Sequence, residues 1–119
     1  MYPGALLALA DAQLTQEQAQ DMTAGGQTCR VITRTYALSG GGEAKAVSAY
    51  PGAYLERLAD EGYAAQLITG FSLAGMDAVY MLGGDRALLA ARDGECVYLL
   101  ETKADEQTVY ALGAAAYLE

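Results

Sequence analysis

The order of apolar and polar residues changes period along the chain, and each change marks a predicted element. The first helix is predicted at residues 15–22, where good helix formers surround a thin apolar stripe. Thr15 and Gln18 have the spacing of a capping box, and Gly25-Gly26 supplies a stop signal. We therefore expect a helix here, lying at the edge of the domain.

Two runs of apolar and β-branched residues, 29–38 and 44–50, predict a hairpin around the glycine-rich segment 39–42. The second half of the chain contains two strong signals for two-residue hairpin turns, Gly83-Gly84 and Asp93-Gly94. The strands predicted in this half span residues 63–71, 78–82, 86–91 and 96–100.

Helical spacing returns twice. Pro51 suits a first helical turn, and the apolar residues after it repeat at helical spacing as far as Gly62. Thr102 or Asp105 is suited to cap a last helix over residues 105–118.

The apolar run at residues 5–10 lacks the basic start of a signal peptide, and it predicts a short buried helix or strand.

These elements predict one domain of the α+β class, spanning residues 1–119. We expect a mostly antiparallel sheet of about six strands with three helices on one face. The predicted order of elements is α-β-β-α-β-β-β-β-α.

The charge of the chain limits the classes of partner that it is expected to bind. Fifteen acidic and seven basic residues give a net charge of −8. A field of that sign repels nucleic acid and anionic lipid, favours solubility and attracts a basic partner. No segment approaches the ~20 apolar residues that span a bilayer. We therefore expect no nucleic-acid partner and no direct membrane insertion.

The chain contains no histidine, so Ser-His-Asp and Cys-His sites are impossible within it. Its carboxylates fall mainly at predicted turns and helix ends, where backbone chemistry explains them. Gly40-Gly41-Gly42 is not followed by a helix or by Lys-Ser/Thr, so it is not a phosphate-binding loop. We predict no catalytic residue, no cofactor and no metal site.

One strip of the first predicted strand stands out. Arg30, Arg34 and Tyr36 point to the same side, because side chains alternate along a strand. In a chain with few basic residues, this strip is a candidate interaction patch for an anionic group or an acidic partner. The alternative is a solvated sheet face whose arginines pair with neighbouring carboxylates.

The two cysteines, Cys29 and Cys96, lie far apart in the sequence. They are candidates for one disulfide if the protein lives in an oxidising compartment. The alternative is that both are small buried apolar residues.

The last third of the chain resembles a family of small extracytoplasmic domains of unknown function, which occur on Gram-positive lipoproteins and anti-sigma-factor-like proteins. The resemblance rests on the strand at 87–91, the turn Asp93-Gly94, the strand at 96–100 and a closing amphipathic helix near Asp105. It implies a sensing or protein-binding module without known catalytic residues.

The leading hypothesis is therefore a non-enzymatic binding or regulatory module with a protein partner, displayed outside a bacterial membrane as a secreted or membrane-anchored protein. The alternative is a cytoplasmic acidic inhibitor or immunity-type protein that binds a basic partner. A small enzyme that uses carboxylates alone is the third option.

Overall fold

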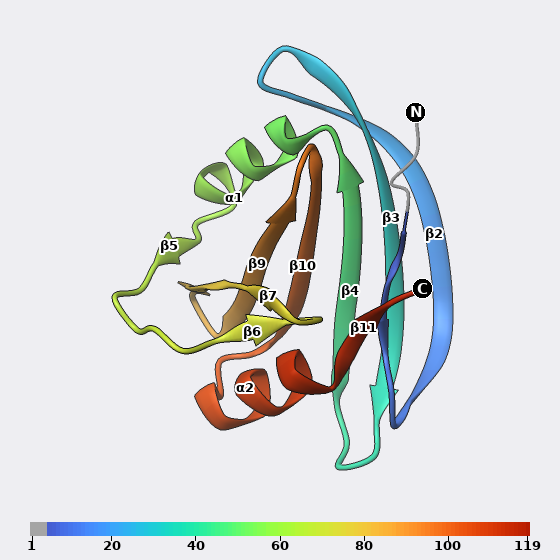
Figure 1. Cartoon of the computed structure of the whole chain (residues 1–119), viewed down its shortest axis with the longest axis vertical. Helices are drawn as coiled ribbons and strands as arrows, with labels where there is room; N and C mark the ends of the chain where they lie inside the picture. The colour runs from blue at the N-terminus through green and yellow to red at the C-terminus, as the bar shows by residue number, and fades with distance from the viewer. Residues whose placement is uncertain (1–4) are drawn as a thin grey trace.

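A computed structural model describes residues 5–119 of the chain (Figure 1). The strands are β1 (Leu7–Leu9), β2 (Ala12–Ala24), β3 (Gln27–Leu38), β4 (Glu43–Tyr50), β5 (Ala64–Ala65), β6 (Ser72–Leu73), β7 (Met76–Asp77), β8 (Val79–Gly83), β9 (Arg86–Asp93), β10 (Cys96–Lys103) and β11 (Ala116–Leu118). The helical segments are the 3₁₀ helix η1 (Gly52–Glu56) and the α-helices α1 (Arg57–Asp60) and α2 (Glu106–Ala115).

The described residues form a seven-stranded sheet in the order β2-β3-β4-β10-β9-β8-β5, with every neighbouring pair antiparallel. Two small two-stranded sheets, β1-β11 and β6-β7, accompany it. The α+β class and the antiparallel sheet are confirmed. The predicted order of elements is wrong, because the described residues begin with two strands and end with β11 after the last helix.

The predicted helix at residues 15–22 is instead part of strand β2, which pairs with β3 along its whole length. Thr15 occupies a β-bulge, and its hydroxyl donates to the carbonyl of Thr35 rather than capping a helix (3.1 Å). Gly25 and Gly26 form the two-residue turn between the strands, with φ of +56° and +73°. The ladder overrides helix propensity here because the thin apolar stripe offers a helix little to bury.

Three other element predictions need correction. The helix expected after Pro51 is divided into η1 and the short α1. The strand expected at residues 63–71 is reduced to β5, because the residues after Ala65 find no strand to pair with within the described part of the chain. The last helix ends at Ala115, and residues 116–118 pair with β1 as β11. The buried strand β1 confirms the prediction for residues 5–10.

The strands predicted at 29–38, 44–50, 78–82, 86–91 and 96–100 are confirmed as β3, β4, β8, β9 and β10. The β8–β9 turn falls at Gly84 and Asp85, one residue later than predicted, because Gly83 still pairs with Arg86.

The helices lie on opposite faces of the sheet, which corrects the prediction of one covered face. We call one of them the α2 face, because α2 lies across it together with β1-β11 and β6-β7 (Figure 1). Alternate residues of the central strands point to it and form its core with the covering elements. The buried members are Leu7, Leu9, Tyr36, Ala44, Ala46, Phe71, Leu73, Tyr80, Ala87, Leu89, Ala91, Tyr98, Leu100, Val109 and Ala116.

The opposite face, the α1 face, carries a second core. Tyr54 from η1 and Leu58 from α1 cover the ends of β3, β4, β9 and β10 nearest the β2–β3 turn. The buried sheet residues beneath them include Cys29, Val31, Ala49, Val97 and Leu99. The central strands are therefore buried on both sides, whereas β2 is exposed along most of its length.

Candidate functional site

The most exposed apolar surface gathers around the irregular segment at residues 66–71, between β5 and β6. Six large apolar side chains are exposed among residues 5–119, and four of them lie here. Leu67 is fully exposed, and Ile68, Val79 and Tyr110 are 40%, 46% and 56% exposed. We call these four residues the loop patch. Contiguous exposed apolar surface of this kind is typical of an interaction site.

Backbone hydrogen bonds fix both ends of this segment. The N–H of Gln66 donates to the carbonyl of Tyr80 on β8 (2.8 Å), and the N–H of Ala78 donates to the carbonyl of Phe71 (3.2 Å). Gly70 has φ of +94°, a conformation that glycine adopts without a steric penalty. The segment therefore turns sharply while both of its ends stay attached to the sheet.

A cluster of packed aromatic rings lies next to the exposed residues of the loop patch. Phe71 is buried and stacks on Tyr80, with ring centroids 4.7 Å apart and planes 12° apart. Tyr110 from α2 contacts Phe71 edge-on at 5.8 Å. Such pairs contribute about 0.5–1.5 kcal/mol beyond the apolar area they bury. Burial raises the pKa of Tyr80, with a smaller effect from the charge of Glu106, so Tyr80 stays neutral near pH 7.

Two hollows flank the segment. The first, of about 480 Å³, is lined by Ile68, Thr69, Phe71, Glu106, Gln107 and Tyr110. The second, of about 570 Å³, is lined by residues 66–72 and 77–79. Each hollow is large enough to admit an apolar side chain of a partner, and the fully exposed Leu67 lines the second.

The rim of the loop patch is acidic. Glu106 lines the first hollow and Asp77 the second, and neither hollow has a Lys or Arg among its described lining residues. Asp105 stands beside Glu106 and caps α2, as predicted. Its carboxylate accepts from the N–H of Gln107 (3.2 Å) and from the hydroxyl of Thr108 (2.6 Å). The Thr108 hydrogen bond is the main cause that lowers the pKa of Asp105.

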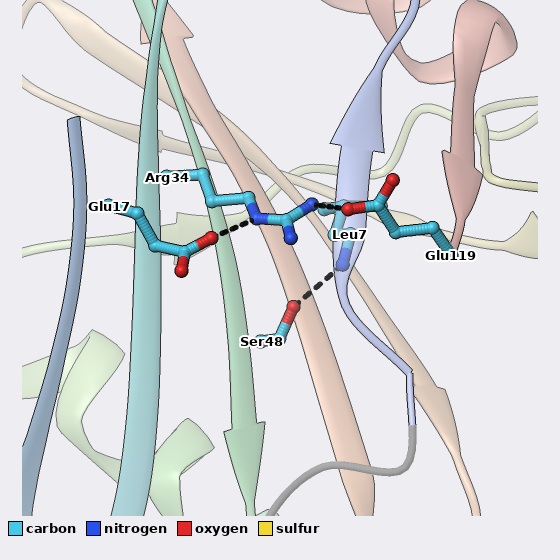
Figure 2. Close-up of polar contacts among 5 residues, drawn as sticks. All are labelled: Leu7, Glu17, Arg34, Ser48 and Glu119. Carbon is cyan, nitrogen blue, oxygen red and sulfur yellow. Dashed lines mark hydrogen bonds and ion pairs between the residues drawn. The ribbon is translucent and has the colours of Figure 1, made fainter. Parts of the chain in front are cut away.

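The predicted interaction patch on β3 has a different environment. Arg34 is largely buried, and its Nε donates to Glu17 on β2 at 2.7 Å, while its Nη1 contacts Glu119 at 2.5 Å (Figure 2). Burial opposes the charge, but hydrogen bonds to Glu17 and Glu119 outweigh it and raise the pKa of Arg34. Arg30 pairs with Asp21 at 3.2 Å.

Tyr36 lies in the core of the α2 face, only 4% exposed. The three predicted residues share one face of β3, but they do not present a joint surface. The arginines pair with neighbouring carboxylates, as the alternative expects, but the face is not solvated, because Arg34 and Tyr36 are buried.

The same view shows how the chain ends are attached. The N–H of Leu7 on β1 donates to the hydroxyl of Ser48 on β4 (2.8 Å; Figure 2). Arg34 contacts Glu119, directly after β11. These contacts join the β1-β11 sheet to the main sheet, so they have a structural role.

A second polar cluster on the α1 face was not predicted. The Tyr63 hydroxyl donates to Glu101 at 2.5 Å, and Arg86 donates to the other oxygen of the same carboxylate at 3.3 Å. Burial, followed by the Glu101 hydrogen bond, raises the pKa of Tyr63. Sequence spacing gave no signal for this cluster, because its members come from three separate elements.

The cysteines are free thiols on opposite faces of the sheet. Cys29 packs in the core of the α1 face, and Cys96 packs against the core of the α2 face. The predicted disulfide therefore does not form in this arrangement, because the sheet lies between the two side chains. Burial raises the pKa of the Cys29 thiol.

Among residues 5–119, no three His, Cys, Asp or Glu side chains come together in a group suited to a metal ion. Neither helix there has the length and apolar character needed to cross a bilayer.

Comparisons of the chain with protein-family models, with curated proteins and with solved structures found no match. The resemblance of the last third to extracytoplasmic domains therefore stays a prediction.

Proposed function

We propose that this protein is a non-enzymatic binding module that docks a segment of a basic protein partner on the loop patch. The observation that carries the proposal is the gathering of four exposed large apolar side chains beside two hollows. The docked segment inserts one or two large apolar side chains into the hollows. Interfaces concentrate their binding energy in such anchors.

Charge selects the partner. The chain has a net charge of −8, and the carboxylates of Glu106 and Asp77 lie on the rim without a basic residue among the described residues lining the hollows. Lys or Arg residues that flank the anchors face these carboxylates in the complex. Complementary charge of this kind accelerates association and discriminates against acidic partners.

The distribution of carboxylates supports binding rather than catalysis. Each of the two hollows is lined by one carboxylate, so neither contains the pair of converging carboxylates that chemistry such as glycoside hydrolysis uses. The proposed setting is outside a bacterial membrane, in a secreted or membrane-anchored protein. The second candidate, a cytoplasmic acidic inhibitor, uses the same surface and the same charge but a different partner.

The test uses a short fluorescently labelled peptide with two leucines among lysines, and anisotropy reports binding. Two comparison peptides replace leucine by serine or lysine by glutamate. We expect only the leucine-lysine peptide to bind. Added salt should weaken this binding, because salt screens the attraction between opposite charges.

The matched variants are Leu67→Ser with Ile68→Ser, and Leu14→Ser as control. Leu14 is 46% exposed on β2, so it resembles Ile68 in chemistry and exposure but lies outside the patch. We expect the patch variant to weaken binding by about tenfold or more, as removal of a hot spot does, and the control to bind normally. Equal binding by the patch variant and the wild type would refute the proposal.

A further inference from the structure

The two edges of the main sheet differ sharply. One edge is β5, a strand of two residues, and such short edge strands protect a sheet from pairing with other chains. The other edge is β2, a strand of 13 residues that is exposed along nearly all its length. Residues 16–24 contain no Lys or Pro, and their pairing with β3 has no bulge. Of the usual protections of an edge strand, this stretch has two charged side chains, Glu17 and Asp21, but no lysine, no proline and no bulge.

The hydrogen bonds identify which backbone groups of β2 face outward. The N–H and the carbonyl of Leu38 both form hydrogen bonds toward the β4 side. Because this direction alternates from one residue of a strand to the next, the even residues of β3 bond to β4 and the odd residues bond to β2. In the register of β2 with β3, the even residues of the stretch 16–24 therefore bond to β3. The groups of Glu17, Ala19, Asp21 and Thr23 face outward, and among them the Thr23 carbonyl accepts a hydrogen bond from Nη1 of Arg57 (3.4 Å).

Ion pairs reduce the charge of the outward edge. The stretch has two carboxylates, and each pairs with an arginine on β3: Glu17 with Arg34 at 2.7 Å, and Asp21 with Arg30 at 3.2 Å. Arg34 also pairs with Glu119, so it is shared between two carboxylates and the edge keeps a small negative charge.

On the α1 face, the stretch 16–24 presents side chains that can pair with the same stretch of a second copy of the chain. Gln16, Gln18 and Gln20 are exposed. A glutamine amide both donates and accepts, so a glutamine that lies on a twofold axis can bond to its own counterpart.

We propose that β2 pairs antiparallel with β2 of a second copy of this chain, about a twofold axis at Gln20, which joins two sheets into one. This register matches the regular stretch 16–24 to itself. It places Glu17 opposite Thr23 and Asp21 opposite Ala19, so no carboxylate faces another. An axis at Ala19 would instead place Glu17 opposite Asp21, and like charges directly opposite are destabilising.

The joined sheet leaves the proposed binding surface free. The loop patch lies beside β5 and β8, at the far end of the strand order from β2. The dimer therefore carries two loop patches at its outer ends and can bind a bivalent partner with avidity.

Sedimentation velocity over a range of protein concentrations tests the dimer. We expect the average mass to rise from 12.4 kDa toward twice that value. Gln20→Lys places two ammonium groups against each other at the axis and should raise the dimer dissociation constant at least about tenfold. Gln13→Lys makes the same charge change on β2 outside the paired stretch and should leave the dimer intact. A wild-type protein that stays monomeric, or a Gln20→Lys dimer of normal affinity, would overturn the proposal.

Cross-linking tests the register. At the axis, Gln20 meets its counterpart in a non-hydrogen-bonded pair, where Cα atoms lie about 4.5 Å apart, within the range of a disulfide. In a Cys96→Ser background, Gln20→Cys should form a dimer under mild oxidation, and Gln18→Cys should not. Equal cross-linking at the two positions would contradict the twofold axis at Gln20.

Discussion

Gly113 tests the packing of α2 most sharply, because the expected sign is the reverse of the usual one. Alanine in place of glycine within a helix normally stabilises by about 1 kcal/mol. At Gly113, however, an added Cβ would lie 2.5 Å from Cδ1 of Leu89 and in direct contact with the backbone oxygen of Ser72. The Ser72 carbonyl belongs to β6 and cannot move without shifting that strand. Overpacking of this kind costs about 1–3 kcal/mol, and often exceeds the gain in helix propensity.

Because one of the two contacts is with backbone that cannot give way, the overpacking cost lies in the upper part of that range, about 2–3 kcal/mol. After the propensity gain of about 1 kcal/mol is subtracted, we expect Gly113→Ala to destabilise the protein by about 1–2 kcal/mol. Thermal unfolding should show a melting temperature lower by about 4–8 °C. Ala111→Gly, at an exposed position of the same helix, measures the ordinary propensity effect and should cost about 1 kcal/mol. A Gly113→Ala variant more stable than the wild type would refute the close contact between α2 and β6.

Three further predictions follow from the polar groups and the thiols. The pKa of Asp105 is lowered mainly by its Thr108 hydrogen bond, so its contribution to stability is present above the unfolded pKa and is lost as pH falls through the folded pKa. The wild type should therefore have a higher urea midpoint than Asp105→Ala at neutral pH, and this difference should become smaller in acid. Burial raises the pKa of Tyr98 to about 12, so its contribution is present below the unfolded pKa and is lost as pH rises toward 12. Tyr98→Phe should make the alkaline loss of stability less steep. A thiol reagent should label Cys96, which is partly exposed, much faster than the buried Cys29, and both should react after unfolding.

The central hairpins could be predicted from the sequence because their signals are local. The β-branched run at 29–38 and the turn signal at Asp93-Gly94 depend only on neighbouring residues. The first agrees with β3, and the second predicts the hairpin, although its turn falls one residue later, at Gly94 and Glu95, because Asp93 still pairs with Cys96. The helix predicted at 15–22 failed because its pairing with β3 is a tertiary interaction that outweighs helix propensity. The Gly25-Gly26 turn was correctly seen as a stop, but it ends a strand rather than a helix.

The loop patch could not be predicted because its residues are apolar and partly β-branched, as in a buried strand. Leu67 and Ile68 lie in a segment whose pattern favours a strand, and only the absence of a pairing partner among the described residues leaves them exposed. Tyr110 joins them from α2, more than 40 positions later in the sequence. The pattern of residues along the chain does not show that these side chains lie close together in the folded protein.

The most direct test of the binding proposal is an NMR titration of the ¹⁵N-labelled protein with the leucine-lysine peptide. Backbone signals of residues 66–71, Val79 and the first turns of α2 should shift in proportion to occupancy, and those of β2 and β3 should stay in place. Shifts centred on Arg30 and Arg34 instead, or an unchanged spectrum at saturating peptide, would contradict docking on the loop patch.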